Sequence, residues 1–144
     1  MELLNFRICG SYIGIESPET GHIDLHNNFD FEHLHFEPTT GTLKLSWQNS
    51  KGLWAKRVPW SILGLNFTGV TYLHIKERDP EYPFTEDAAL ANICHTPPNA
   101  RDEFETVYFN EDAKPDYDLT LYFQSEWGLK VNAATVRLDL EPIT

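Results

Sequence analysis

Histidine and carboxylate side chains that could ligate a metal lie close together near the N-terminus. His22-x-Asp24-x-His26 places three ligand types at alternate positions, so a strand would carry them on one side. His33-x-His35 adds two imidazoles a few residues later. Neutral imidazole and carboxylate are ligands of zinc and other transition metals. These five side chains define one hypothesis, a small metal- or ligand-binding β-barrel.

Positive charge beside the second histidine pair opposes a metal site. The hairpin register derived below places Lys44 and Arg57 next to His33 and His35, and a cationic surrounding repels a metal ion. We therefore favour a solvated polar surface for these histidines and expect no cofactor.

Other short motifs for catalysis or ion binding are weak. Cys94-His95 pairs a nucleophile with a base, but neighbours on an extended chain point to opposite faces, so we expect Cys94 to be a buried structural thiol. Cys9 and Cys94 fit reduced thiols of a cytosolic protein. The carboxylates between Glu111 and Asp118 lack the spacing and turn glycine of a calcium-binding EF-hand loop, so a bare acidic rim is the expectation there.

The most distinctive feature is the uneven distribution of charge. The segment from Asp79 to Asp118 holds 11 of the 22 carboxylates and only two bases, Arg101 and Lys114. The segment from Pro38 to Lys76 has no Asp or Glu and five bases. A field of this kind governs which partners approach and how fast.

The acidic segment also carries aromatic residues and several prolines, which favour ordered loops over long strands. Carboxylates around aromatic anchors make a suitable surface for a basic protein, because charge selects the partner while buried aromatics supply affinity. The alternative is that the carboxylates only keep a small protein soluble. The predicted partner-binding residues are Asp79, Glu81, Tyr82, Phe84, Glu86, Asp87, Asp102, Glu103, Glu105 and Tyr108.

Alternation of apolar and polar residues predicts many short strands. It is clearest in the segments 43–47, 119–123 and 136–140. Further strands are expected over 3–9, 12–16, 22–25, 29–37, 53–58, 67–76 and 104–109, and one short helix over Thr85 to Cys94. The sequence therefore predicts a mainly β fold, a single-domain antiparallel β-sandwich or open barrel spanning residues 1–144, with at most one or two short helices.

Two hairpin registers follow from the turn signals. A four-residue loop at Pro38–Gly41 places Phe36 opposite Leu43, Leu34 opposite Leu45, and Glu32 opposite Trp47. His33, His35, Lys44 and Ser46 then share the other face. A second turn at Asn49–Gly52 would place Trp47 opposite Trp54 and Lys44 opposite Arg57.

The net charge of the chain limits the classes of partner that it can bind. The formal net charge of −11 disfavours nucleic acid and anionic membranes, both of which require a sustained cationic surface. The N-terminal residues lack the basic region of a secretory signal, and no apolar run approaches a spanning length, so we expect a cytoplasmic location.

The sequence thus favours a non-enzymatic protein that binds a basic protein partner. Its most concrete version is a bacterial immunity or antitoxin-type inhibitor, whose carboxylates mimic a phosphate backbone in the cleft of a basic toxin such as a nuclease. The alternatives are the metal- or ligand-binding barrel and a structural module whose sheet edges pair with neighbours.

Overall fold

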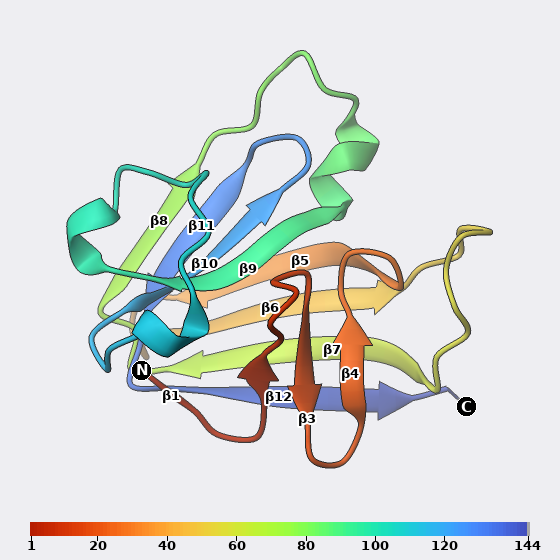
Figure 1. Ribbon diagram of the computed structural model, residues 1–144, viewed down its shortest axis with the longest axis horizontal. Helices are drawn as coiled ribbons and strands as arrows, with labels where there is room; N and C mark the ends of the chain where they lie inside the picture. Colours follow the sequence, from red (N-terminus) through yellow and green to blue (C-terminus); the bar gives the residue numbers. More distant parts are fainter. Residues whose placement is uncertain (144) are drawn as a thin grey trace.

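The structure is a computed structural model, and it describes residues 1–143 (Figure 1). Its strands form three sheets. The five-stranded sheet has the order β1 (Glu2–Leu3), β12 (Thr135–Pro142), β7 (Trp60–Thr68), β6 (Thr42–Asn49) and β5 (Phe29–Glu37). The four-stranded sheet has the order β8 (Tyr72–Lys76), β11 (Gly128–Asn132), β10 (Asp118–Phe123) and β9 (Leu90–Thr96). The three-stranded sheet contains β2 (Arg7–Ile8), β3 (Gly14–Ser17) and β4 (Gly21–Asp24).

Helical structure within residues 1–143 is limited to three short 3-10 segments: η1 (Phe84–Ala88), η2 (Pro98–Ala100) and η3 (Asn110–Asp112). The prediction of a mainly β, sandwich-like fold is confirmed, and the described strands do not close into a barrel. No helix in the described part of the chain is long and apolar enough to cross a membrane.

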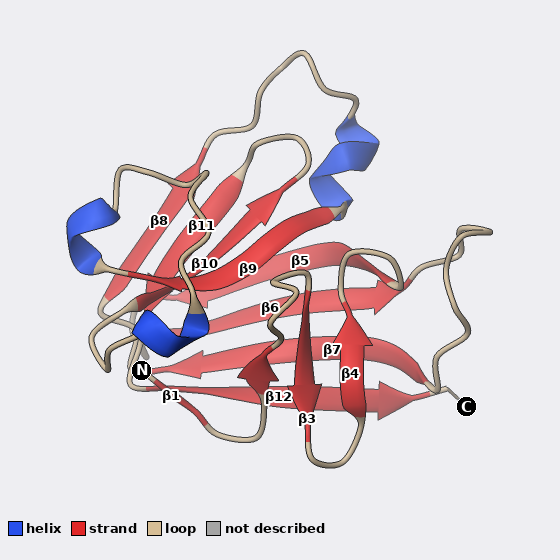
Figure 2. Cartoon of the chain, viewed as in Figure 1, coloured by secondary structure: helices blue, strands red, loops and turns tan. Residues whose placement is uncertain are grey.

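The core lies between the inner face of the five-stranded sheet and the two smaller sheets. Alternation along β6 buries Leu43, Leu45 and Trp47 while Lys44 and Gln48 face solvent. Leu121 of β10 and Ile15 of β3 belong to the same buried cluster. Figure 2 shows β3 and β4 crossing in front of β7 and β12 at a steep angle, so the small sheet covers part of the larger one.

The first predicted hairpin is confirmed except at its open end. Phe36 pairs with Leu43 and Leu34 with Leu45, as the turn at residues 38–41 required. The pairing of Glu32 with Trp47 is wrong, because a β-bulge shifts the register and Phe31 lies opposite Trp47 instead. Glu32 is the extra residue of that bulge, and the bulge keeps the Phe31 ring in edge contact with the Trp47 ring, 5.1 Å between centroids.

The second predicted hairpin is wrong. Residues 50–59 form a loop, so no strand spans 53–58, and β6 pairs instead with β7, Leu45 opposite Leu65. The loop is closed at its neck by Asn28. The Ser50 N–H donates to the Asn28 carbonyl at 2.8 Å and the Lys56 N–H donates to its side-chain Oδ1 at 2.9 Å. Trp54 is left in solvent, because the alternating apolar residues of β7 fill the core in its place.

The predicted helix from Thr85 to Cys94 is also wrong. The 3-10 segment η1 ends at Ala88, and residues 90–96 become β9, antiparallel to β10. The alanines of this segment favour a helix, but a strand forms because it buries Leu90 and Ile93 against the core. The predicted strand at 104–109 is wrong as well, since those residues run as a loop.

That loop belongs to a longer cover over the outer face of the four-stranded sheet, residues 97–117, which we call the strap. Under the strap, Lys130 is fully buried, and its ammonium group donates hydrogen bonds to the carbonyls of Ala100 and Glu103. Arg101 forms a two-pronged ion pair with buried Asp118 at 2.9 and 3.0 Å. Hydrogen bonds to charged groups are stronger than neutral ones, so these contacts hold the strap in place.

One edge of the five-stranded sheet is closed partly by a side chain. β1 runs parallel to β12 for only two residue pairs, Glu2 with Thr135 and Leu3 with Val136. Beyond them, the Asn5 amide takes the place of a strand: its Nδ2 donates to the Leu138 carbonyl and its Oδ1 accepts from the Leu138 N–H, each at 2.8 Å. Asn5 thus satisfies two backbone groups of an edge strand.

We predict that Asn5→Ala lowers the free energy of unfolding by about 1–3 kcal/mol, because it removes both hydrogen bonds from a part-buried backbone. Urea denaturation monitored by tryptophan fluorescence measures the effect. Asn99→Ala, an exposed position in η2, is the control and should change the free energy by less than about 0.5 kcal/mol. Equal effects of the two substitutions would contradict the role given to Asn5.

Candidate functional site

Four aromatic rings join the two larger sheets at one end of the sandwich. Trp127 stacks on Phe123, with 4.1 Å between ring centroids and 6° between planes. Phe31 touches Trp127, Phe123 and Trp47, at 5.3, 5.1 and 5.1 Å. The Trp127 indole N–H donates to the Asp87 carbonyl at 2.8 Å, which fixes η1 beside the rings. This packing sets the position of the loop before β9.

A groove of about 500 Å³ opens beside these rings, between the edge strands of the two larger sheets. Phe31 and Glu32 of β5 form one side of the groove, together with residues 75–78 at the end of β8 and just after it. Phe84, Asp87 and Ala88 of η1 and Trp127 of the β10–β11 turn complete the lining. Its apolar lining is therefore supplied by segments that are far apart in the sequence.

Large apolar side chains around the groove face solvent. Phe84 is 80% exposed, Ile75 50% and Tyr82 40%. Phe84 is nevertheless held in place, because the Arg78 guanidinium lies 4.4 Å from its ring centroid. Arg78 in turn pairs with Asp87 at 2.9 Å and donates to the Tyr82 carbonyl at 2.8 Å. These exposed apolar groups make the loop around the groove a candidate interaction surface.

Carboxylates meet at an acidic corner beside the groove, formed by Asp79, Glu105 and Glu126. The hydrogen bond from the Glu81 N–H and an interaction with Glu126 lower the pKa of Asp79. The same interaction with Asp79 raises the pKa of Glu126, to which Glu105 adds a smaller repulsion. Below them, burial and then the charge of Glu126 raise the pKa of Tyr122 to about 12.

The ten sequence-predicted partner residues separate into two groups. Six lie on the loop between β8 and β9, of which Phe84 and Asp87 line the groove: Asp79, Glu81, Tyr82, Phe84, Glu86 and Asp87. Glu105 comes from the strap but reaches the acidic corner, since its charge acts on Tyr122 and Glu126. The other three, Asp102, Glu103 and Tyr108, lie along the strap.

The strap residues are used largely inside the fold. Burial opposes ionisation of Glu103, but hydrogen bonds from Thr106 and Glu105 lower the pKa of its carboxyl. The Tyr108 N–H donates to the thiol of buried Cys94, whose pKa burial raises. These contacts make Glu103 and Tyr108 supports of the loop.

Sequence reasoning missed several residues of this surface. Ile75 and Trp127 lie in the groove, and Glu126 lies at the acidic corner. Only a strand pairing between β8 and β11, Gly128 opposite Lys76, brings them together. Among the described residues that line the groove, the bases are Lys76 and Arg78, and the carboxylates of the groove, of the loop after β8 and of the corner outnumber them. These carboxylates are Glu32, Glu77, Asp79, Glu81, Glu86, Asp87, Glu105 and Glu126.

The histidines proposed as metal ligands lie in different layers. His22 and Asp24 belong to β4, whereas His33 and His35 project from the outer face of β5 beside Lys44. His26 binds the Leu90 carbonyl through Nδ1, and Asp24 accepts from the backbone and side chain of Asn27. Within residues 1–143, no group of three His, Cys, Asp or Glu is placed to hold a metal ion.

His22 instead contacts a cysteine. Its Nδ1 lies 2.8 Å from the Cys9 sulfur, a contact that Gly14 permits because a Cβ there would lie 2.2 Å from the Ile23 carbonyl oxygen and 3.2 Å from the His22 ring. Burial, followed by the charge of Glu16, raises the pKa of Cys9 to about 11. The thiol is thus neutral at pH 7 and poorly suited to nucleophilic attack.

Cys94 and His95 fall on opposite faces of β9, as predicted. Cys94 lies opposite Thr120 under the strap, and His95 opposite Leu119 on the inner side. Both cysteines are buried free thiols.

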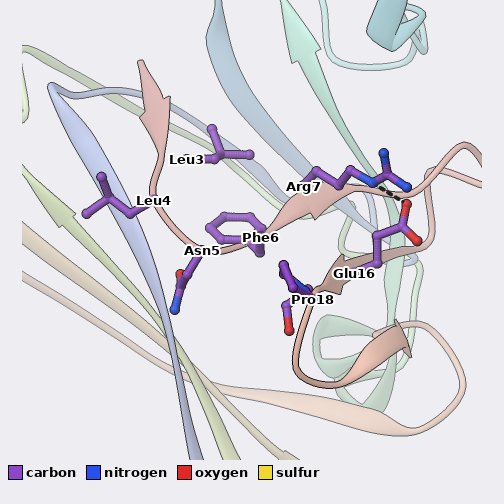
Figure 3. Close-up of a pocket in the computed structure, with 8 residues that line it drawn as sticks. Leu3, Leu4, Asn5, Phe6, Arg7, Glu16 and Pro18 are labelled. Atoms are coloured by element: carbon purple, nitrogen blue, oxygen red, sulfur yellow. Dashed lines mark hydrogen bonds and ion pairs between the residues drawn. The ribbon is translucent and has the colours of Figure 1, made fainter.

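A second hollow of about 430 Å³ lies between the N-terminal segment and β3 (Figure 3). Its polar side chains are already paired: Arg7 with Glu16 at 2.6 Å, and Asn5 with the Leu138 backbone. It contains none of the residues that the sequence singled out. The groove is therefore the better candidate for a functional surface.

Comparison of the chain with protein-family models, curated proteins and solved structures found no match.

We predict that Glu126→Gln stabilises the protein more at pH 7 than at pH 4. The raised pKa of Glu126 means that its contribution to stability is present below its unfolded pKa and is lost as pH rises through the folded pKa. Glutamine keeps a donor toward Asp79 at every pH. Urea midpoints at both pH values measure the difference.

Glu19→Gln, at an exposed position near the β3–β4 turn, makes the same charge change and serves as the control. An identical pH response of the two variants would show that Asp79 and Glu126 are not linked in the folded protein.

Proposed function

We propose that this chain is a non-enzymatic protein-binding domain whose groove and acidic corner take a basic protein partner. The observation that carries the proposal is Phe84, an 80% exposed aromatic ring fixed over an apolar groove and surrounded by carboxylates. Desolvated aromatic anchors supply most of the affinity of an interface, and surrounding charges select the partner and accelerate association.

The charges of the groove are arranged to favour a cationic partner. Its two bases are already engaged, because Arg78 pairs with Asp87 and Lys76 donates to the Glu126 carbonyl at 2.7 Å. Glu32, Glu77 and Glu81 are exposed carboxylates, and each makes no ion pair to a lysine or arginine. A partner with Lys or Arg around an apolar side chain would satisfy both features of the surface.

The most concrete version is an inhibitor of a basic toxin such as a nuclease, of the immunity or antitoxin type, acting in a bacterial cytoplasm. A nuclease cleft is cationic because it binds phosphates. Carboxylates at the rim of the groove would occupy that cleft as phosphates do, while Phe84 and Tyr82 anchor the complex.

The experiment is affinity capture from an extract of the source cells at low salt, followed by elution with a salt step. We expect one basic protein at stoichiometric yield. We expect Phe84→Ala to reduce its affinity roughly tenfold or more, because the ring is the anchor. The triple variant Glu77→Gln/Glu81→Gln/Glu105→Gln should slow association and flatten its dependence on salt.

The matched control is Glu2→Gln/Glu19→Gln/Glu141→Gln, which removes the same charge at exposed positions away from the groove. If both triple variants capture the same mixture of weakly bound cationic proteins, the proposal is contradicted. The carboxylates would then serve only to keep the protein soluble.

A further inference from the structure

Residues 50–58, which we call the tip loop, carry the two most exposed large apolar side chains outside the groove. Leu53 is fully exposed and Trp54 is 70% exposed. Three bases, Lys51, Lys56 and Arg57, flank them, and the loop contains no acid. The tip loop therefore presents an apolar pair inside a cationic surround, and Figure 1 shows it projecting at the right-hand margin of the molecule.

The tip loop is built to present these side chains. Besides the two Asn28 contacts at its neck, the Gly52 N–H donates to the Ser50 hydroxyl at 3.2 Å and the Ala55 N–H donates to the Gly52 carbonyl at 3.1 Å. The Trp54 ring lies over Gly52, where a Cβ would come within 2.3 Å of the ring. Pre-organisation of this kind lowers the entropy lost on binding.

The tip loop and the groove are complementary in apolar surface and in charge. The loop offers two apolar side chains among bases, and the groove offers an apolar lining of about 500 Å³ among acids. The chain does not use them on itself, because Leu53 and Phe84 are both left in solvent. One molecule thus carries both halves of a contact that only a second molecule can complete.

We propose that the tip loop of one copy docks in the groove of a second copy of this chain. Trp54 and Leu53 pack against Phe84, Ile75 and Trp127, while Lys51, Lys56 and Arg57 face the groove carboxylates. This inference rests on the proposed function, since it names a partner for the same groove. The contact joins two different surfaces, so it is heterologous and adds copies head to tail, in an open chain or a closed ring.

The charge distribution favours this occupant over an anionic membrane. The net charge of −11 repels the chain from an anionic bilayer and from a second copy alike, so the local charges at the contact decide between them, and a bilayer offers no apolar groove among acids. A second copy instead places the loop bases directly against the acidic groove. Self-association also covers the groove, so a basic partner must displace the second copy in order to bind.

Sedimentation velocity over a range of protein and salt concentrations tests the proposal. We expect concentration-dependent association that weakens as salt rises, because the bases and acids at the contact are exposed. Trp54→Ala and Phe84→Ala should each weaken association at least tenfold, since each removes an anchor from one half. Both residues are exposed, so neither substitution removes a core side chain.

The decisive measurement mixes the two variants. Trp54→Ala retains an intact groove and Phe84→Ala retains an intact tip loop, so an equimolar mixture should form a one-to-one complex that neither variant forms alone. Phe109→Ala, at a 58% exposed ring on the strap, and Lys44→Gln, on the outer sheet face, are the controls and should associate as the wild type does.

A wild-type chain that stays monomeric, or a mixture that fails to complement, would overturn the inference. If the captured basic protein still needs Phe84 in that case, the proposed function stands without it; if it does not, both fail. The last measurement is binding of the protein to vesicles of phosphatidylserine and phosphatidylcholine. Monomers that bind these vesicles through Trp54 would overturn the inference and assign the tip loop to a lipid surface.

Discussion

The packing of Phe31, Trp47, Phe123 and Trp127 is the constraint on which the functional end of this molecule depends. Aromatic rings bury large areas and prefer edge or offset contacts, so four of them connected through Phe31 determine how closely two sheets approach. Here they fill the space between β5 and β10 and leave the groove open beside them.

The same rings connect the core to the surface. Trp127 is both a member of the stack and the donor to the Asp87 carbonyl, so η1 is held by the core. Asp87 binds Arg78, and Arg78 covers the Phe84 ring. A chain of contacts thus runs from the partly buried Trp127, which stacks on buried Phe123, to the Phe84 ring, which is 80% exposed. Phe84 can stay in solvent in a defined position because each residue before it is fixed.

Charge in this protein divides into a structural and an available part. Asp118 and Lys130 are fully buried, Asp118 accepts from Arg101 and Asn132, Lys130 donates to two strap carbonyls, and together they hold the strap on the four-stranded sheet. Burying such charges is tolerated only with partners of this quality. The exposed carboxylates at the groove have fewer internal partners and remain available to another molecule. Membership of the acidic segment therefore does not by itself indicate a binding role, as Glu103 and Asp118 show.

Alternation along the chain was sufficient to predict a mainly β fold, a sandwich or an open barrel, because a strand with one buried face repeats its apolar residues every two positions whatever it packs against. The pairings of Phe36 with Leu43 and Leu34 with Leu45 followed from turn length and the same period. The uneven distribution of acidic and basic residues along the chain was likewise known from the sequence, because it depends only on the order of the residues.

Only the tertiary structure decided which residues from distant segments meet. The bulge at Glu32, the pairing of β6 with β7 across a ten-residue loop, and the conversion of a helix-like segment into β9 all depend on which apolar face finds space in the core. The groove joins residues 31, 75, 84 and 127, and Glu126 meets Asp79 through the pairing of β8 with β11. Contacts between distant segments have no local signature, because the free energy that selects them comes from shared burial and not from the conformational preference of any one segment.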